Sequence, residues 1–142
     1  MNNDNKKYSE LLDAAKAARG DSYCPYSHFA VGAALLTKSG KIYTGANIEN
    51  ASYTPTVCAE RVAFFRAISE GEREFSAIAI AGGPASRPSS SPTPPCGVCR
   101  QVMAEFADSD FKIILNGGDA PVVYTLDEIL PLRFDKGNLG GV

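Results

Sequence analysis

The amino-acid sequence predicts an α/β fold, a three-layer sandwich in which helices cover both faces of one mixed five-stranded sheet. Helical and strand-like segments alternate along the chain in the order α-β-β-α-β-α-β-β-α. Two of the connections between neighbouring strands are too short for a parallel crossover, so part of the sheet is antiparallel. The length of 142 residues and the hydrophobic content of 44% suit one core, and therefore a single domain over residues 1–142.

The first third of the chain predicts a helix followed by a hairpin. Apolar residues recur at helical spacing over residues 8–18, and this pattern stops at Gly20, a residue type that often follows a helix. Two strand-like segments, 30–37 and 41–46, flank a Ser-Gly turn signal. We therefore expect an amphipathic helix and, after it, two adjacent antiparallel strands.

The middle of the chain predicts a buried helix, a buried strand and a long loop. Apolar residues cover nearly every face of segment 59–70. Segment 75–81 is a short apolar run, typical of a strand inside a sheet that helices cover. Residues 82–95 include five prolines and four serines, which predicts a surface loop. An interdomain linker is the alternative, but the roughly 45 residues after it are too few for an ordinary second domain.

The last third predicts a helix over 97–106, a second hairpin and a short terminal helix. Strands at 112–115 and 122–125 are joined by a short connection that contains Gly, Asp and Pro, which favours an antiparallel pair. The segment Thr125-Leu126-Asp127-Glu128 has the spacing of a capping box, so a helix begins there and ends near Pro131.

Two short motifs, Cys58-Ala59-Glu60 and a later Pro-Cys-Gly-Val-Cys that contains Cys96 and Cys99, predict a catalytic zinc centre. Three thiolates can hold Zn²⁺ and leave its fourth tetrahedral position to water, and a carboxylate two residues from a ligand can handle that water's protons. The motifs match the signature of zinc-dependent base deaminases. We predict one zinc ion per chain, with Cys58, Cys96 and Cys99 as ligands and Glu60 as the proton shuttle.

Three thiolates give the zinc site a formal charge of about minus one, which weakens the ion as a Lewis acid. Two features offset this charge in our prediction. The ligands lie at the starts of two predicted helices, where the macrodipole is positive, and Arg61 follows Glu60 and can donate to a thiolate sulfur.

Structural roles for the cysteines are the alternative. Cys96 and Cys99 would then belong to a zinc ribbon, or all the cysteines would be small buried apolar residues. A ribbon usually offers a second Cys-x-x-Cys or a Cys/His pair, whereas the partner here is a single Cys beside a carboxylate. Cys24 has no partner at a suitable spacing, so we predict a free thiol, which suits a reducing compartment.

Composition argues against two classes of partner. Fourteen basic and sixteen acidic residues give a net charge of −2, and no Lys/Arg stripe is present that would follow a phosphate backbone. No stretch approaches the roughly 18 apolar residues of a membrane span, and segment 1–7 lacks the apolar core of a signal peptide. We therefore expect a soluble, cytoplasmic protein with neither a nucleic-acid nor a membrane partner.

Five blocks of sequence resemble the small, homotetrameric cytidine deaminases, and the likeness extends from about residue 11 to residue 134. The blocks are PYSHF at 25–29, VGAALL at 31–36, NIEN at 47–50, CAER at 58–61 and PCGVCRQ at 95–101. This resemblance implies a homotetramer that deaminates cytidine and 2′-deoxycytidine to uridine and 2′-deoxyuridine, in pyrimidine salvage.

The resemblance also implies roles in substrate binding. Phe29 would pack against the pyrimidine, and Asn47 and Glu49 would bond the ribose hydroxyls. Phe134 lies in a segment similar to the one through which a neighbouring subunit's Phe reaches the pocket. The backbone of Ala59, at a helix start, is predicted to bond the base or the reaction intermediate. Composition alone would instead make these side chains a core Phe, a turn-forming Asn and a solvated Glu.

Two other functions stay open at this point. One is deamination of a different aminopyrimidine-like base, such as a nucleoside antibiotic, because the pocket lining decides the substrate. The NIEN block favours a free ribose. The other is a catalytically silent, zinc-stabilised interaction domain, which the presence of Glu60 disfavours. Editing of polynucleotides ranks lowest, because basic surface is lacking and the last two strands are predicted to be antiparallel. His28 is assigned no chemistry.

Overall fold

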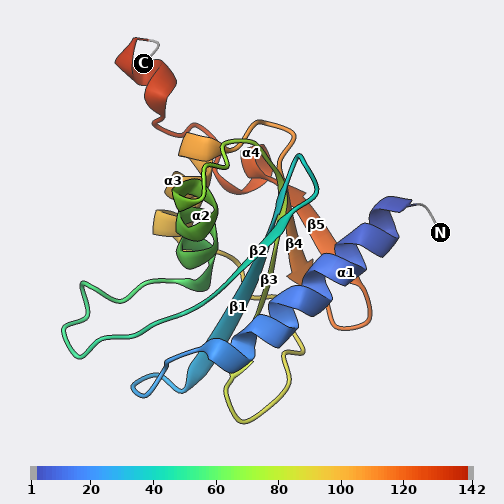
Figure 1. Ribbon diagram of the computed structural model, residues 1–142, viewed down its shortest axis with the longest axis vertical. Helices are drawn as coiled ribbons and strands as arrows, with labels where there is room; N and C mark the ends of the chain where they lie inside the picture. The colour runs from blue at the N-terminus through green and yellow to red at the C-terminus, as the bar shows by residue number, and fades with distance from the viewer. Residues whose placement is uncertain (1–2, 141–142) are drawn as a thin grey trace.

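The computed structural model describes residues 3–140 and contains the mixed five-stranded sheet that the sequence predicts (Figure 1). The strands are β1 (Phe29–Thr37), β2 (Ile42–Ala46), β3 (Phe75–Pro84), β4 (Lys112–Asn116) and β5 (Pro121–Thr125). Their order across the sheet is β2-β1-β3-β4-β5. Strands β3 and β4 pair in parallel and the other neighbours pair antiparallel, including the predicted β4–β5 hairpin.

Helices lie on both faces of this sheet, which confirms the three-layer architecture. Helix α1 (Asn3–Ala18) covers one face, whereas α2 (Ala59–Ser69) and α3 (Gly97–Phe106) cover the other (Figure 1). The short α4 (Leu126–Ile129) begins at the predicted capping box of Thr125 and Glu128. Two 3₁₀ turns, η1 (Arg19–Asp21) and η2 (Lys136–Leu139), were not predicted from the sequence.

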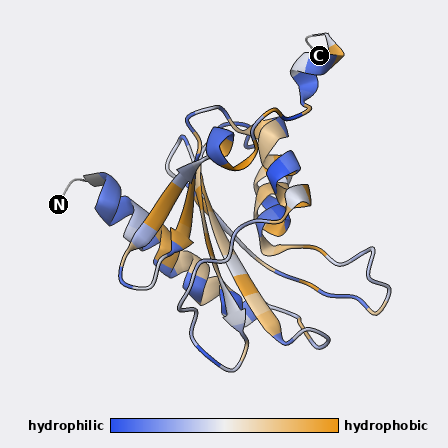
Figure 2. Cartoon of the chain, turned by 180° about the vertical axis from the view of Figure 1, so that it is seen from behind, coloured by the Kyte–Doolittle hydropathy of each residue, from blue (hydrophilic) through white to orange (hydrophobic). Residues whose placement is uncertain are grey.

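Alternating side chains of the central strands build two separate cores. Ile78 and Ile80 of β3 belong to the core under α2 and α3. Ala77, Ala79 and Ala81 of the same strand belong to the core under α1. The strands are accordingly among the most hydrophobic parts of the chain (Figure 2). Because the side chains facing α1 are mostly small, that helix lies close to the sheet.

Two glycines allow this close approach of helices to strands. A Cβ atom on Gly32 of β1 would lie 2.1 Å from the carbonyl oxygen of Ala15 in α1. A Cβ atom on Gly45 of β2 would lie 2.4 Å from the carbonyl oxygen of Ala59 in α2. Any larger residue at either position would push a helix away from the sheet. Gly45 therefore helps to set the position of α2, the helix that carries Glu60.

The main difference from the predicted fold lies at the end of β3. The sequence predicts a loop from residue 82 onward, whereas β3 continues to Pro84 because Gly83 and Pro84 pair with Ala30 and Phe29 of β1. Glycine and proline disfavour strands, but here pairing with a neighbouring strand overrides that preference. The Pro/Ser-rich loop consequently starts directly beside Phe29.

The helices of the described part, residues 3–140, include none that is both long and apolar enough to cross a membrane.

Candidate metal centre

Two helix N-termini bring the three predicted ligands together. Cys58 is the N-cap of α2 and Cys96 is the N-cap of α3, and both residues have extended backbone conformations. Cys99 lies one turn into α3. Neither side chain makes a capping hydrogen bond to its helix, so both sulfur atoms remain available to a ligand. The three Sγ atoms all lie within 4.8 Å of one another.

The sulfur positions fit a tetrahedral zinc ion. The Sγ atoms of Cys58 and Cys96 are 3.7 Å apart, and those of Cys96 and Cys99 are 3.6 Å apart. Zn–S bonds of about 2.3 Å at tetrahedral angles would place the sulfur atoms about 3.8 Å apart. Three protein ligands leave the fourth position open, as in a catalytic site. All four cysteines are free, which confirms the prediction for Cys24.

Arg61 and the arrangement of the thiols favour an ionised sulfur. The Arg61 Nη2 atom donates to Cys58 Sγ at 3.4 Å, as predicted, and the buried Nε of Arg61 has no partner within the described chain. A hydrogen bond from the Cys99 thiol, together with Arg61, lowers the pKa of Cys58 to about 5. The pKa of Cys99 lies above its ordinary value because Cys99 donates this hydrogen bond and is buried. Such a cluster suits a divalent cation.

Glu60 lies in the first turn of α2 and is only 4% exposed. Burial raises the pKa of its carboxyl to about 7, and the nearby Cys58 thiolate acts in the same direction. A carboxyl group with a pKa near neutrality can both accept and release a proton at physiological pH. Glu60 is thus a buried acid–base group next to the thiols.

A second feature, a cavity of about 370 Å³, is formed by the loop between β2 and α2 and by the turn before β1. Its lining residues are Tyr26, Ser27, Glu49, Asn50, Tyr53 and Thr56. The loop projects from the sheet (Figure 1). Ile48 and Val57 pair where this loop begins and ends: the backbone N–H group of each donates to the carbonyl of the other at 3.0 Å. Because Val57 precedes Cys58, a short segment joins this loop to the metal centre.

The structure brings three of the predicted substrate-binding residues together. Phe29 is the first residue of β1 and is 39% exposed. The Asn47 side-chain amide donates to the Phe29 carbonyl at 2.9 Å, and Glu49 lines the cavity. The backbone of Ala59, which is fully buried, begins α2.

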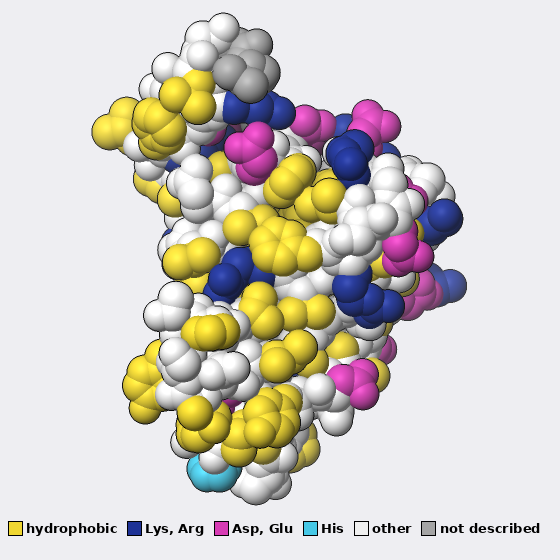
Figure 3. Space-filling model, turned by 60° about the vertical axis from the view of Figure 1, so that its left-hand side comes forward, with side chains coloured by type: hydrophobic (Ala, Val, Ile, Leu, Met, Phe, Trp, Pro, Cys, Tyr) yellow, Lys and Arg dark blue, Asp and Glu magenta, His cyan; other side chains and the backbone are white. Residues whose placement is uncertain are grey.

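Phe134 lies elsewhere, beyond α4. The Phe134 carbonyl accepts a hydrogen bond from the Gln101 side chain at 2.8 Å, and Phe134 is 62% exposed. It is not among the residues that line the cavity. Apolar side chains are numerous on the side of the molecule that carries α2, α3 and the projecting loop (Figure 3). Tyr53, in that loop, is 80% exposed.

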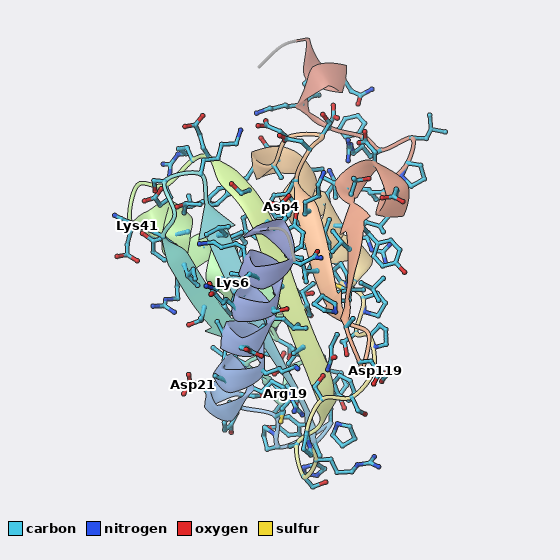
Figure 4. All side chains as sticks on the ribbon, turned by 90° about the vertical axis from the view of Figure 1, so that its right-hand side faces the viewer. Asp4, Lys6, Arg19, Asp21, Lys41 and Asp119 are labelled. Carbon is cyan, nitrogen blue, oxygen red and sulfur yellow. The ribbon has the colours of Figure 1, made fainter. Side chains whose placement is uncertain are left out.

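Arg19 also organises this region, although the sequence did not predict this role. The Nε atom of Arg19 donates to the Ala30 carbonyl at 2.9 Å, and Nη1 donates to the Arg87 carbonyl at 3.1 Å. Its Nη2 donates to the carbonyls of Gly83 and Pro84, each at 3.0 Å. Figure 4 shows Arg19 at the end of α1, beside the loop that follows β3. No local pattern marks this role, because an arginine at the end of a helix is ordinarily solvated.

The chain is similar to known zinc deaminases over most of its length. Residues 5–115 match the family described as the cytidine and deoxycytidylate deaminase zinc-binding region. A cytidine deaminase from Halalkalibacterium halodurans is 50% identical over 126 residues, which cover 87% of this chain and 91% of the relative. A solved cytidine deaminase structure from Burkholderia pseudomallei has a TM-score of 0.81 and 42% identity, and covers 94% of this chain and 100% of that one. A blasticidin-S deaminase from Bacillus cereus is 35% identical over 75% of this chain and 77% of its own.

Proposed function

The chain belongs to the cytidine and deoxycytidylate deaminase family, and we propose that it hydrolyses cytidine and 2′-deoxycytidine to uridine and 2′-deoxyuridine with release of ammonia. One observation carries the proposal: three thiols lie within 4.8 Å of one another at two helix starts, next to the buried acid–base group Glu60. The proposal treats residues 1–142 as one deaminase domain that acts in pyrimidine salvage.

Cys58, Cys96 and Cys99 would hold one zinc ion per chain. Zinc, when bound, supplies a Lewis acid that makes water reactive at neutral pH. The N-termini of α2 and α3 and the guanidinium of Arg61 offset the negative charge of the three thiolates.

Glu60 moves the protons in the proposed reaction. It accepts a proton from the attacking water and gives it to N3 of the ring, while the oxygen adds to C4. The tetrahedral C4 then carries both a hydroxyl and an amino group. Glu60 next transfers the hydroxyl proton to the amino nitrogen. The C–N bond then breaks and ammonia leaves. The ring keeps the proton on N3, and the product is uridine. The pKa near 7 suits this two-way transfer.

Residues at the start of β1, in the loop after β2 and at the start of α2 would hold the nucleoside. Phe29 packs against the pyrimidine, and Asn47 and Glu49 bond the ribose hydroxyls. The Ala59 N–H, at the N-terminus of α2, bonds the base or the tetrahedral species. The partial exposure of Phe29 and the position of Glu49 in the cavity support this arrangement.

A homotetramer with shared active sites is part of the proposal. Phe134 would complete the site of a neighbouring subunit, which explains why such a large apolar side chain is 62% exposed in a single chain. Cys24, a free thiol that is not among the proposed ligands, supports a reducing compartment, the cytoplasm.

An ultraviolet assay tests the function directly. Purified protein is incubated with cytidine, 2′-deoxycytidine, blasticidin S, adenosine and guanosine, with release of ammonia as the second readout. The proposal requires turnover of the first two compounds, with a higher kcat/KM for cytidine than for blasticidin S. The reverse preference would favour the second candidate function, which the similarity to a blasticidin-S deaminase supports. Turnover of none of the compounds by zinc-loaded protein would favour a silent zinc domain.

A further inference from the structure

The turn before β1 holds the Glu49 carboxylate with three hydrogen bonds. The backbone N–H groups of Tyr26 and Ser27 donate to Glu49 Oε1 at 3.0 and 3.1 Å, and the Ser27 hydroxyl donates to Oε2. Hydrogen bonds to an ionised acceptor are stronger and more directional than bonds between neutral groups. The pKa of Glu49 lies below its ordinary value, with the Ser27 hydroxyl as the largest cause. The carboxylate therefore has a defined orientation although it lines an open cavity.

The Ser27 hydroxyl makes a second contact, which links Glu49 to Phe29. Its oxygen accepts a hydrogen bond from the Phe29 backbone N–H at 3.0 Å. On the other side, Asn47 donates to the Phe29 carbonyl at 2.9 Å and accepts from the Val31 N–H at 2.9 Å. Both backbone polar groups of Phe29 are thus held by this group of polar side chains.

The Glu49 carboxylate retains room for one more donor. A carboxylate has about four acceptor positions, two on each oxygen. Oε1 accepts from two backbone N–H groups, whereas among residues 3–140 the Ser27 hydroxyl is the sole donor to Oε2. A hydroxyl of a molecule in the cavity can occupy the remaining position on Oε2.

We propose that Ser27 is a positioning residue that sets the affinity for the sugar of the substrate, because its hydroxyl orients Glu49 toward a ribose hydroxyl and ties it to Phe29. This inference rests on the proposed function and deepens it. Ser27 acts through Glu49, and its effect falls on substrate binding and not on proton transfer by Glu60.

A purely structural role for Ser27 makes a different prediction. The bond from the Phe29 N–H to the Ser27 hydroxyl is a common local turn motif, and the intervening His28 has a φ of 56°, a left-handed value that is costly for a residue other than glycine. If Ser27 only stabilised this turn, removal of its hydroxyl would weaken the binding of every substrate equally, whether or not the substrate has sugar hydroxyls.

The test compares Ser27→Ala with Ser27→Thr on cytidine and on 2′,3′-dideoxycytidine, which lacks both ribose-ring hydroxyls. Loss of one hydrogen bond to a charged group should raise the KM for cytidine about tenfold in Ser27→Ala, with kcat changed by less than about twofold. The KM for dideoxycytidine should stay unchanged, and Ser27→Thr should restore the KM for cytidine. An unchanged KM for cytidine, or equal increases for the two substrates, would overturn the inference.

A double-mutant cycle with Glu49→Gln gives a second measurement. If Ser27 acts through Glu49, then Ser27→Ala should add little to the KM increase that Glu49→Gln causes, whereas additive effects would contradict the coupling. Ser27→Cys, which keeps the size of the side chain but donates weakly, replaces Ser27→Ala if that variant does not fold.

Binding of uridine, measured by calorimetry, reports the same coupling without turnover. Weaker binding of uridine by Ser27→Ala, with unchanged binding of 2′,3′-dideoxyuridine, would support the inference. Equal binding of uridine by wild type and variant, or equal losses for both ligands, would oppose it. Failure of the wild-type protein to deaminate cytidine would instead overturn the proposed function, so the two failures are distinguishable.

Discussion

The metal end of the candidate site, around Glu60 and the three thiols, and its proposed sugar end, around Ser27 and Glu49, are held in different ways. At the metal end, Cys99 and Glu60 are 1% and 4% exposed, and they lie on helices packed against the sheet. At the sugar end, Ser27 and Glu49 lie on loops and are held by hydrogen bonds between polar groups. Packing energy is spread over many atoms, whereas each hydrogen bond depends on two groups. Because the proposed proton transfer takes place at the metal end, changes there should affect kcat. Changes at the proposed sugar end should affect KM.

The largest effect is expected from Glu60→Gln at the metal end. Gln keeps the shape of the side chain but cannot carry the proton, so kcat for cytidine should fall on the order of 10⁴-fold or more while fold and zinc content persist. Steady-state kinetics and elemental analysis of the same sample measure both quantities. Retention of even a tenth of wild-type turnover would contradict the proton-shuttle role.

Substitution of the ligands should remove the metal. Cys58→Ala, Cys96→Ala and Cys99→Ala should each lower the zinc content of the purified protein, with a corresponding loss of turnover. Cys24→Ala is the matched control and should keep one zinc per chain. Two metal ions per chain, or a zinc content that depends on Cys24, would be incompatible with the three-thiolate site.

The two ends also differ in how well the sequence predicts them. The metal end depends on two contiguous motifs, and the structure confirms the predicted helix start in each. The proposed ligands and the proposed shuttle come from the same local patterns. The five strands were predicted for the same reason. The hydrogen bonds of the sugar end join residues far apart in sequence: Ser27 lies 22 positions from Glu49, and Arg19 lies 64 from Gly83. Only tertiary pairing creates these contacts, as it also creates the extension of β3.

Deletion of the residues after Leu130 tests whether a partner subunit completes the sugar end. The truncated chain should keep its zinc, because all three ligands lie upstream, but should lose most of its turnover together with Phe134. Phe134→Ala in the full-length chain is the matched control for the deletion and should cause a similar loss.

Mixing the truncated chain with full-length Glu60→Gln should restore part of the turnover. In such a hybrid the full-length subunit lends Phe134 to a truncated neighbour that has an intact Glu60. Light scattering establishes the assembly state of each sample. A fully active monomer, or hybrids that form without any recovery of turnover, would argue against shared sites.

Arg61→Gln tests the charge balance of the metal end without removing a ligand. Loss of the guanidinium beside Cys58 should weaken zinc binding about tenfold, in line with the usual cost of removing a group that supports a metal ligand. Competition with a chelator measures this affinity. Arg66→Gln is a control on the same helix, since Arg66 bonds the Thr44 carbonyl and no thiol. Equal zinc affinities for wild type and Arg61→Gln would make Arg61 an ordinary helix residue.

Arg19→Lys should have the smallest effect and should separate the two ends most clearly. Lysine cannot reproduce the planar fork that donates to four carbonyl groups around the start of β1 and the end of β3. We expect a loss of about 1–2 kcal/mol in the free energy of unfolding, a decrease of several degrees in Tm and a KM for cytidine raised a few-fold. Zinc content and kcat should stay at wild-type values, because the four carbonyl groups that Arg19 bonds all lie outside α2 and α3. A fall in zinc content in this variant would show that the two ends are energetically coupled, and the contrast between packing and individual hydrogen bonds would then be insufficient to explain the site.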